Sequence, residues 1–350
     1  MAKNSSILVS VIIVNYNGEQ FLEKCLGSVF RQTKIPYEVI VVDSGSSDNS
    51  LEILNSKFKN KKWLKIIAFP ENIGPAAGRN IGARESNGRY LAFLDYDTEV
   101  GHDWLSKPIT YLEKHPDIGV GQLKILKMGS ENIYDCAGEK LTEFGFLSER
   151  ARSTKDTGQF DQVEDIFSGK TAAMVVKKEV FEKIGGFDQD IFMYWEEPDF
   201  CWRVWKSGYR VVFLPMGKIW HAYGTKNKKV SQTHSLWITH QGCRNQLITI
   251  IKNATGFNLF KMLLAVITTW WILLISFLIK FDLKRAKAVI DAFIWLASHP
   301  KTLIRKRNQL KKKLGVQFYQ DSNWLSKVVI KRSIKWYLGK GYSYLFGKKF

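Results

Sequence analysis

Residues 8–18 read Leu8-Val9-Ser10-Val11-Ile12-Ile13-Val14-Asn15-Tyr16-Asn17-Gly18. The run Leu8–Val14 is rich in β-branched residues, which predicts a buried strand. The polar segment Asn15–Gly18 ends that strand, because turn-forming residues interrupt the apolar run. Apolar residues then recur at helical spacing from Phe21 to Phe30, so a helix is predicted to follow the strand.

The same alternation of strand and helix continues to residue 94. Apolar runs predict strands at Val39–Val42, Leu64–Phe69 and Tyr90–Leu94, with helices between them. Alternation of this kind is typical of right-handed crossovers and a parallel sheet covered by helices on both faces. Beyond it, the sequence predicts three more strands and two more helices: strands at Val120–Leu126, Thr171–Val176 and Tyr209–Leu214, and helices ending before Gly185-Gly186 and beginning near Pro198.

Four polar segments follow the first four strands: Asn15–Gly18, Asp43–Ser47, Pro70–Gly74 and Asp95–Asp97. In a parallel sheet the carboxyl ends of the strands share one edge, where ligands gather. The pattern therefore predicts a polar, partly acidic ligand site at that edge.

Composition separates the chain into a nearly neutral part and a basic part. The 350 residues include 52 Lys and Arg against 33 Asp and Glu, and 45% are hydrophobic, which excludes a wholly disordered chain. Residues 280–350 hold 18 of the bases and 3 of the acids, a net charge of +15. Four scattered cysteines show no disulfide or zinc spacing, and the N-terminal apolar run is too short for a signal peptide. We therefore expect the protein to lie in a reducing compartment. The excess of basic residues in one segment indicates where in the cell the protein is held.

Met262–Ile279 contains 18 residues without a charge, about 27 Å of helix. A single crossing would separate the N-terminal domain from the basic segment, and both are expected in the cytosol. Trp270 and Trp271 also lie at mid-segment, whereas Trp in spanning helices prefers the interfaces. We therefore expect a re-entrant or in-plane helix, with Ala288–Ala297 as a second surface segment; the alternative is a buried core helix. The expected domains are 1–255 (catalytic), 256–300 (membrane-associated helices) and 301–350 (basic tail).

Asp95-Tyr96-Asp97 closes the fourth predicted strand with two carboxylates two residues apart. Such a pair suits a hard divalent cation, Mg²⁺ or Mn²⁺, which takes oxygen ligands and leaves positions open for phosphate. Asp43, at the end of the second strand, is placed to accept a hydrogen bond from a pyrimidine imide N–H. In isolation, either segment is more typical of an ordinary solvated turn, and for Asp95-Tyr96-Asp97 it is the placement at the polar edge of the sheet that favours a metal site.

Asn72–Asn80 is a loop of small residues that enters a helix. Small side chains let a ligand approach the backbone, and Arg79 can pair with a diphosphate there. The loop lacks the Gly-Lys-Ser/Thr of a phosphate loop and the Gly-x-Gly-x-x-Gly of a dinucleotide site. The alternative is a plain strand-to-helix connection.

Phe192–Asp199 places three carboxylates within four residues, flanked by aromatic residues. Glu197 is predicted at a helix N-terminus, where the helix dipole favours its ionised form and apolar neighbours disfavour it. That balance suits a general base; the alternative is an acidic first helical turn. His221, after the last predicted strand, is a metal or diphosphate contact only if the chain returns to Asp97.

Taken in order, these segments resemble a family-2 inverting glycosyltransferase, and most closely its rhamnosyltransferase-like bacterial branch. The resemblance covers about residues 7–255. The segments that carry it are Val11–Asn17, Val41–Asp48, Asn72-x-Gly74, Arg79-Asn80-x-Gly82, Leu94–Asp97, Gly185–Asp188, Glu196–Asp199 and Trp220-His221. It implies a GT-A fold, an α/β mixed sheet with helices on both faces, a nucleotide-sugar donor and a divalent cation (Mg²⁺ or Mn²⁺).

The resemblance also implies a role for each matched residue. Asp97 and His221 are implied as metal contacts, and Glu197 as the base, with Glu196 as the alternative because the family's Glu-Asp pair reads Glu-Glu here. Trp195 and Asp199 fall on the acceptor side. The donor-binding set is Asn15, Tyr16, Asp43, Asn72, Gly74, Arg79, Asn80 and Asp95.

The sequence as a whole predicts transfer of a hexose or rhamnose from a UDP- or dTDP-sugar to a glycan or lipid-linked acceptor. We expect this in cell-surface polysaccharide synthesis at the cytoplasmic face of the membrane, with the basic C-terminal segment on anionic lipid. One alternative is a nucleotidyltransferase acting on sugar phosphates, although Asn15–Gln20 lacks the basic residues of an activation loop. The other is a non-enzymatic protein that binds anionic membranes or nucleic acid through Arg305–Arg307 and Lys311–Lys313; no base-reading motif accompanies these clusters, so no nucleic acid is expected.

Overall fold

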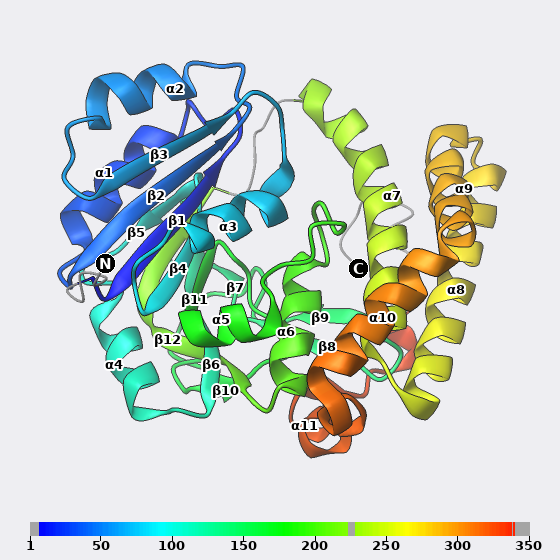
Figure 1. The fold of residues 1–350 in the computed structure, drawn as a ribbon. Coiled ribbons are helices and arrows are strands. Elements are labelled where there is room, and N and C mark those ends of the chain that lie inside the picture. Colours follow the sequence, from blue (N-terminus) through cyan, green and yellow to red (C-terminus); the bar gives the residue numbers. More distant parts are fainter. Residues whose placement is uncertain (1–6, 223–227, 338, 340–350) are drawn as a thin grey trace. The chain divides into compact units, whose positions relative to one another are not determined.

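The computed structural model describes residues 7–222, 228–337 and 339 (Figure 1). The chain divides into two compact units. Unit 1 comprises Met1–Glu139 and Glu149–Gly224, and unit 2 comprises Lys140–Ser148 and Thr225–Phe350. The predicted boundaries at 255 and 300 stay predictions; the division between the units falls at 224–225.

Unit 1 is built on a mixed ten-stranded sheet with the order β10-β12-β6-β11-β4-β1-β2-β3, to which β5 and β7 add at β12 and β6. The first four strands are parallel, β11 is antiparallel to both its neighbours, and β12 is parallel to β6. The strands are β1 (Val9–Asn15), β2 (Tyr37–Ser44), β3 (Leu64–Phe69), β4 (Tyr90–Asp95), β5 (Thr98–Val100), β6 (Ile118–Lys127), β7 (Tyr134–Cys136), β10 (Glu164–Asp165), β11 (Ala173–Lys177) and β12 (Arg210–His221).

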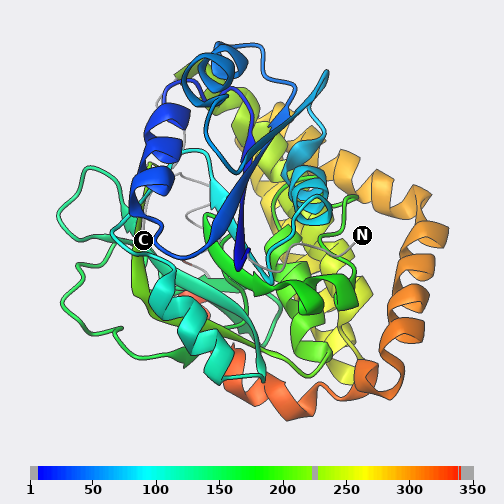
Figure 2. The same cartoon turned by 60° about the vertical axis from the view of Figure 1, so that its left-hand side comes forward.

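The helices of unit 1 are α1 (Leu22–Gln32), α2 (Ser50–Ile53), continued by a π-helical turn (Leu54–Phe58), α3 (Gly74–Arg84), α4 (Ser106–Lys114), α5 (Lys178–Ile184) and α6 (Glu196–Lys206). Figure 2 shows β1–β3 with α1 on one side and α3 on the other. The prediction of a mixed α/β sheet with helices on both faces is confirmed.

The alternating side chains of β1 explain this layering. Val9, Val11 and Ile13 lie in one core with α1 residues such as Leu26 and Val29. The opposite face of the strand packs against α3, where Gly78 and Gly82 leave no room for a side chain. A Cβ on Gly82 would lie 2.5 Å from Ile12, and one on Gly78 would lie 2.8 Å from Val14. Because β1 is buried on both faces, its sequence is an almost continuous apolar run.

The predicted strand Tyr209–Leu214 is wrong in its extent. β12 runs from Arg210 to His221, because a shift in register between Phe213 and Lys218 lets the chain pass Pro215 and resume pairing. Its second half pairs with β5, with His221 opposite Thr98. His221 therefore lies at the end of a strand and not in a loop after the last strand.

The elements of unit 2 whose bounds are described include five α-helices, a short 3₁₀-helix (Gly315–Tyr319) and a small sheet. The helices are α7 (Lys228–Asn253), α8 (Gly256–Ile279), α9 (Leu283–Ser298), α10 (Pro300–Leu314) and α11 (Ser322–Val328), and the sheet has the order β13-β8-β9, with bounds Val329–Ile330, Glu139–Thr142 and Leu147–Glu149. Arg307 of α10 donates to the carbonyl oxygens of Ile251 and Ala254 (2.5 and 2.7 Å), which caps the C-terminal end of α7. Much of the basic segment is thus folded as helix.

Candidate active site

Three of the predicted site residues lie at or next to the ends of neighbouring strands. Asn15 of β1 lies opposite Asp43 of β2, and Val14 lies opposite Asp95 of β4. The register of the parallel strands therefore brings Asp43, Asn15 and Asp95 to one edge of the sheet. This is the edge at which the sequence predicted a ligand site.

Asp43 is buried and its orientation is fixed by two side chains. Asn15 Nδ2 donates to Asp43 Oδ2 (2.8 Å), and so does Ser46 Oγ (2.7 Å), while the main-chain N–H of Ser46 donates to Oδ1 (3.0 Å). Asn15 thus holds the carboxylate in place. Tyr16, the next residue after β1, keeps 43% of its surface exposed and is available to contact a ligand.

The loop that begins α3 is held by hydrogen bonds to the end of β2. Ser44 Oγ donates to Asn72 Oδ1 (3.1 Å) and accepts from the main-chain N–H of Ile73 (2.9 Å). Gly74 has a φ of +80°, and a Cβ at this position would lie 2.6 Å from the ring of Phe192. Glycine is required here because the backbone is left-handed and an aromatic ring occupies the side-chain space.

Arg79 links the sheet edge to the acidic helix α6. Its Nη2 donates to Asp95 Oδ1 (3.0 Å) and its Nη1 to Glu196 Oε1 (3.1 Å), and all but 7% of its side chain is buried. Burial alone would lower the pKa of Arg79, but the charges of Asp95 and Glu196 outweigh it and raise that pKa. The guanidinium is therefore a fixed positive charge between two acids that are 101 positions apart in the sequence.

The two glutamates of α6 lie in different surroundings. Glu196 is 3% exposed, and burial together with the charge of Glu197 raises its pKa to about 8. Glu197 is half-buried, and its Oε1 accepts from the hydroxyl (2.8 Å) and the main-chain N–H (3.2 Å) of Thr171. Among the described residues, none donates to its second oxygen, Oε2.

The chain enters α6 through two left-handed residues. Tyr194 has a φ of +63° and Trp195 a φ of +73°, and neither is a glycine. Consecutive residues in this region are strained, and such strain is concentrated at functional sites. The bend ends at the first turn of α6 and so sets where Glu196 and Glu197 lie.

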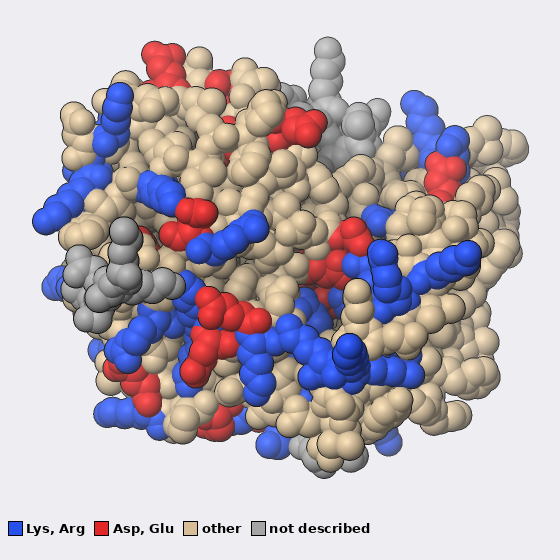
Figure 3. Space-filling view, in the orientation of Figure 1, with Lys and Arg blue, Asp and Glu red and all other residues tan. Residues whose placement is uncertain are grey.

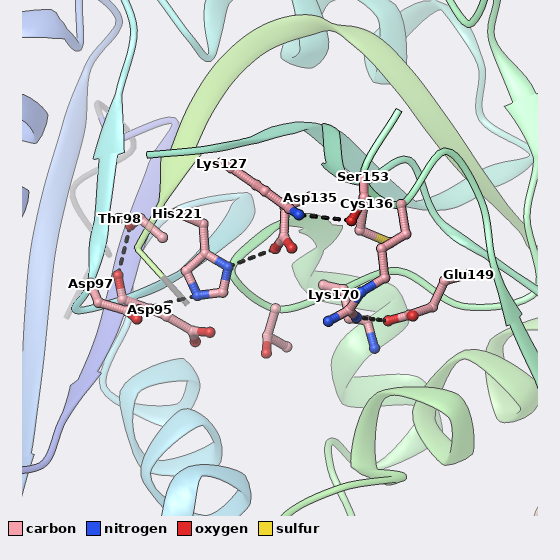
Figure 4. A network of polar contacts seen from close by, with 12 residues as sticks. Asp95, Asp97, Thr98, Lys127, Asp135, Cys136, Glu149, Ser153, Lys170 and His221 are labelled. Carbon is pink, nitrogen blue, oxygen red and sulfur yellow. Dashed lines mark hydrogen bonds and ion pairs between the residues drawn. The ribbon is translucent and has the colours of Figure 1, made fainter. Parts of the chain in front are cut away.

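His221 lies between two aspartates (Figure 4). Its Nδ1 is 2.8 Å from Asp135 Oδ2, and its Nε2 is 3.3 Å from Asp97 Oδ1. Burial alone would lower the pKa of His221, but the hydrogen bonds to Asp135 and Asp97 raise it to about 10. The chain therefore does return to Asp97 at His221, which is the condition for His221 to act as a metal or diphosphate contact.

Asp95, Asp97 and His221 can hold a metal ion. Each offers one ligand atom, and these atoms lie within 4.8 Å of one another. Two carboxylate oxygens and an imidazole nitrogen fit Mn²⁺ or Mg²⁺, provided that the histidine gives up its proton. Burial raises the pKa of Asp95, with Arg79 opposing the shift.

Two predicted ligand contacts are engaged within the protein. Asn80 Nδ2 donates to the carbonyl of Phe187 (2.8 Å), and its Oδ1 accepts from the main-chain N–H of Phe187 (2.9 Å). Asp199 has no exposed surface. Its Oδ2 accepts a hydrogen bond from Arg203 Nε (3.0 Å), and Arg203 Nη2 lies 2.9 Å from the same oxygen as an ion pair. These contacts favour a structural role for both side chains over ligand binding.

Sequence reasoning missed Asp135, Thr171 and the pair of Lys170 with Glu139. Asp135 lies in the three-residue strand β7, whose irregular surroundings gave no pattern to read. Lys170 Nζ is 2.8 Å from Glu139 Oε1. Burial alone would lower the pKa of Lys170, but the charges of Glu139 and Glu197 outweigh burial and raise that pKa.

The chain is similar in sequence to known glycosyltransferases. The chain is 30% identical over 211 residues to glycosyltransferase AglE of Haloferax volcanii, an alignment that covers 59% of this chain and 64% of the relative. It is 32% identical over 109 residues to the poly(ribitol-phosphate) beta-N-acetylglucosaminyltransferase TarS of Staphylococcus aureus, which covers 30% of this chain and 19% of TarS. The chain thus spans less than two thirds of the length of these relatives.

Solved structures show the same fold. Residues 1–349 of S. aureus TarS in complex with UDP-GlcNAc align with a TM-score of 0.55 at 17% identity, covering 98% of this chain and 93% of that one. GalNAc-T7 with UDP, GalNAc and Mn²⁺ aligns with a TM-score of 0.57 at 19% identity, covering 71% of this chain and 48% of that one. The fold is therefore GT-A. Residues 10–185 match the model of glycosyl transferase family 2, and the chain belongs to that family.

Proposed function

We propose that this glycosyltransferase moves a sugar, with inversion, from a nucleoside-diphosphate donor to a hydroxyl of a glycan or lipid-linked acceptor. The observation that carries the proposal is the double contact of Arg79. By holding Asp95 and Glu196 together, it places the first turn of α6 beside the acidic edge of the sheet. A base on α6 is thus next to residues suited to a donor.

Glu197 is the better of the two candidate bases. Glu196 is buried and committed to Arg79, whereas Glu197 is partly exposed and is held through only one of its oxygens. Glu197 Oε2 takes the proton of the acceptor hydroxyl while that oxygen forms a bond to the anomeric carbon. The bond from the anomeric carbon to the diphosphate oxygen breaks, and the nucleoside diphosphate leaves with the electron pair. General-base help of this kind is worth about 10²–10⁴ in rate.

Asp95, Asp97 and His221 would hold the divalent cation, Mg²⁺ or Mn²⁺. When bound, that cation offsets the negative charge that develops on the departing diphosphate. Asp135 accepts from His221 Nδ1 and so directs Nε2 toward Asp97. The Mn²⁺ in the GalNAc-T7 structure supports a cation in this fold.

Asp43, Asn15, Tyr16, Asn72 and Gly74 are proposed to contact the donor, with Asp43 on the nucleobase. For Arg79 and Asn80 we propose a different role from the one that the resemblance implied. Both side chains are engaged inside the protein, so Arg79 positions Asp95 and Glu196, and Asn80 positions the chain at Phe187. On the acceptor side, we keep Trp195 and leave out the fully buried Asp199.

The finer assignments follow the relatives. The UDP-GlcNAc bound by TarS supports a UDP-sugar, with a dTDP-sugar as the alternative, and the name of TarS supports a cell-surface polymer as acceptor. Work at the cytoplasmic face of the membrane is consistent with both. A rhamnosyl donor rests on the sequence resemblance alone.

The test is to incubate the full-length protein with a nucleotide sugar, Mn²⁺ and a lipid-linked glycan extract, and to identify the released nucleotide. The expected product is the nucleoside diphosphate, lost in Glu197→Gln and retained in Glu182→Gln, a matched change at an exposed position of α5 (65% exposed). A nucleotidyltransferase would instead leave the nucleotide sugar intact in this assay, and it would release pyrophosphate when given a nucleoside triphosphate and a sugar 1-phosphate. Full turnover by Glu197→Gln would move the base to another residue.

A further inference from the structure

Helix α8 of unit 2 has one buried face and one exposed apolar face. Among the described residues, it is the one helix whose length and composition suit a membrane crossing, yet only 33% of its apolar window is buried. The exposed large side chains lie at intervals of three, four or seven residues, with two adjacent pairs: Phe257, Phe260, Leu264, Trp271, Ile272, Ile275, Leu278 and Ile279. Spacing of this kind forms a single stripe on a helix of 24 residues, about 36 Å long.

The opposite face of α8 is buried in the helices of unit 2 and makes a polar contact there through Trp270. Trp270, 3% exposed, donates from Nε1 to Gln246 Oε1 of α7 (3.1 Å), and Gln246 Nε2 donates to the carbonyl of Gly145 (2.9 Å). Helix α7 also buries Gln241 and Asn245. If α8 crossed a bilayer, it would either lose these bonds or take buried amides with it into hydrocarbon. The exposed stripe therefore suits the surface of a bilayer better than its interior.

The apolar surface continues over the turn into α9. Phe281 is 86% exposed and Leu283 is 63% exposed, and Ile290 and Ile294 extend the surface along α9. Trp271 of α8 stacks on Phe293 of α9 with ring centroids 5.5 Å apart, which joins the two helices into one surface. We call this the α8–α9 surface: the stripe of α8, the turn at residues 279–283, and Ile290 and Ile294.

The charges beside this surface are positive. Lys280, Lys284 and Lys287 are exposed at and after the turn. The nearby acids are paired: Asp282 with Arg285 (3.5 Å) and Asp291 with Lys287 (2.6 Å). In Figure 3 the area over α8 and α9 is mostly uncharged, while Lys and Arg gather over α10. Apolar side chains bordered by lysines match the acyl layer and the anionic headgroups of a lipid bilayer.

We propose that the α8–α9 surface binds an anionic lipid bilayer, with α8 lying in the membrane plane. Phe281 and Leu283 insert into the acyl boundary, and Lys280 and Lys284 contact headgroup phosphates. The occupant is a bilayer surface because the stripe is long, apolar and bordered by bases. This inference concerns unit 2 alone and does not depend on the proposed donor or base.

The experiment is flotation of the full-length protein with lipid vesicles. One set contains phosphatidylcholine alone, and in the other about a third of the lipid is phosphatidylglycerol, to supply the negative surface that lysines require. The variants are Phe281→Ser with Leu283→Ser, and Lys280→Glu with Lys284→Glu. The matched controls are in unit 1: Trp63→Ser, at a half-exposed aromatic, and Lys61→Glu with Lys62→Glu.

Wild type is expected to float with the anionic vesicles and weakly with the neutral ones. The apolar double variant should bind at least about tenfold more weakly, since each buried side chain of this size contributes about 1.5–3 kcal/mol. The charge-reversed variant should lose its preference for phosphatidylglycerol, and both controls should bind as wild type does. Matching circular dichroism and melting temperatures will show that the variants fold.

Three results would overturn the proposal. The first is that wild type does not float with anionic vesicles. The second is that the controls lose as much binding as the test variants do. The third is that the apolar variant converts a dimer into monomers while vesicle binding stays unchanged, which would assign the surface to a second copy of the chain. Catalytic turnover on a soluble acceptor tests the proposed function separately.

Discussion

Thr171 donates two hydrogen bonds to one oxygen of Glu197, from its hydroxyl (2.8 Å) and from its main-chain N–H (3.2 Å). Both bonds reach Oε1 and thereby orient Oε2. Because Thr171 lies just before β11 and Glu197 lies in the first turn of α6, the contact ties the candidate base to the sheet.

Replacing Thr171 by valine tests this positioning role. Thr171→Val keeps the shape and the main-chain N–H but removes the hydroxyl, so we expect kcat to fall by about tenfold, the equivalent of one hydrogen bond to a charged group. Thr171→Ser, which keeps the hydroxyl, should restore kcat. An effect on KM alone, or on stability alone, would contradict the role.

Asp135 is expected to control the affinity for metal without touching it. Asp135→Asn removes the carboxylate that orients His221, and loss of such a partner typically costs about 10–100-fold in metal affinity. The Mn²⁺ concentration that gives half-maximal activity should rise accordingly. Asp291→Asn, an Asp-to-Asn change in unit 2, is the matched control and should leave that concentration unchanged. An unaltered Mn²⁺ requirement in Asp135→Asn would place the metal elsewhere.

The raised pKa of His221 predicts how stability depends on pH. The folded pKa of about 10 exceeds the ordinary value of 6.5, so the folded protein holds this proton more tightly than the unfolded chain. Its contribution is complete below pH 6.5 and falls as the pH rises toward 10. In chelator, the melting temperature of wild type should therefore fall more steeply from pH 6 to pH 9 than that of His221→Gln. Parallel curves would show that the histidine is not held in this way.

Asp199 is expected to matter for stability. Asp199 has no exposed surface and forms an ion pair with Arg203. Breaking a buried ion pair costs about 3–5 kcal/mol of stability. Asp199→Asn should thus lower the free energy of unfolding by about that amount, whereas Glu182→Gln should change it by less than about 0.5 kcal/mol. A stable Asp199→Asn with a raised acceptor KM would restore the acceptor-side role that the resemblance implied.

The sequence predicted the first half of the sheet well because its strands are buried on both faces. Leu64–Phe69 is a strand with the predicted bounds. Asp95 ends its strand, and Asp43 lies one residue before the end of β2. The sequence did not reveal that β12 continues past Pro215, because a bulge depends on pairing with β6 and β5 and leaves no local signal. Nor did it reveal α7, whose many polar residues hide its helical period.

The site was predicted in its residue types but only partly in its contacts. Acids at strand ends could be placed at one edge from topology alone. That Arg79 joins Asp95 to Glu196, or that Asp135 orients His221, depends on side chains from segments distant in the sequence. Sequence spacing carries no information on such contacts, so Arg79 was assigned to a diphosphate and Asp135 was missed.

Donor binding tests the central claim most directly, because it requires no knowledge of the acceptor. The measurement is the melting temperature of wild type and of Asp97→Ala with a panel of UDP-, dTDP- and GDP-sugars, each with and without Mn²⁺. We predict that at least one nucleotide sugar raises the melting temperature of wild type only when Mn²⁺ is present, and that Asp97→Ala shows no such rise. If no nucleotide sugar stabilises wild type, or if Asp97→Ala responds equally, the metal-assisted donor site at this sheet edge is contradicted.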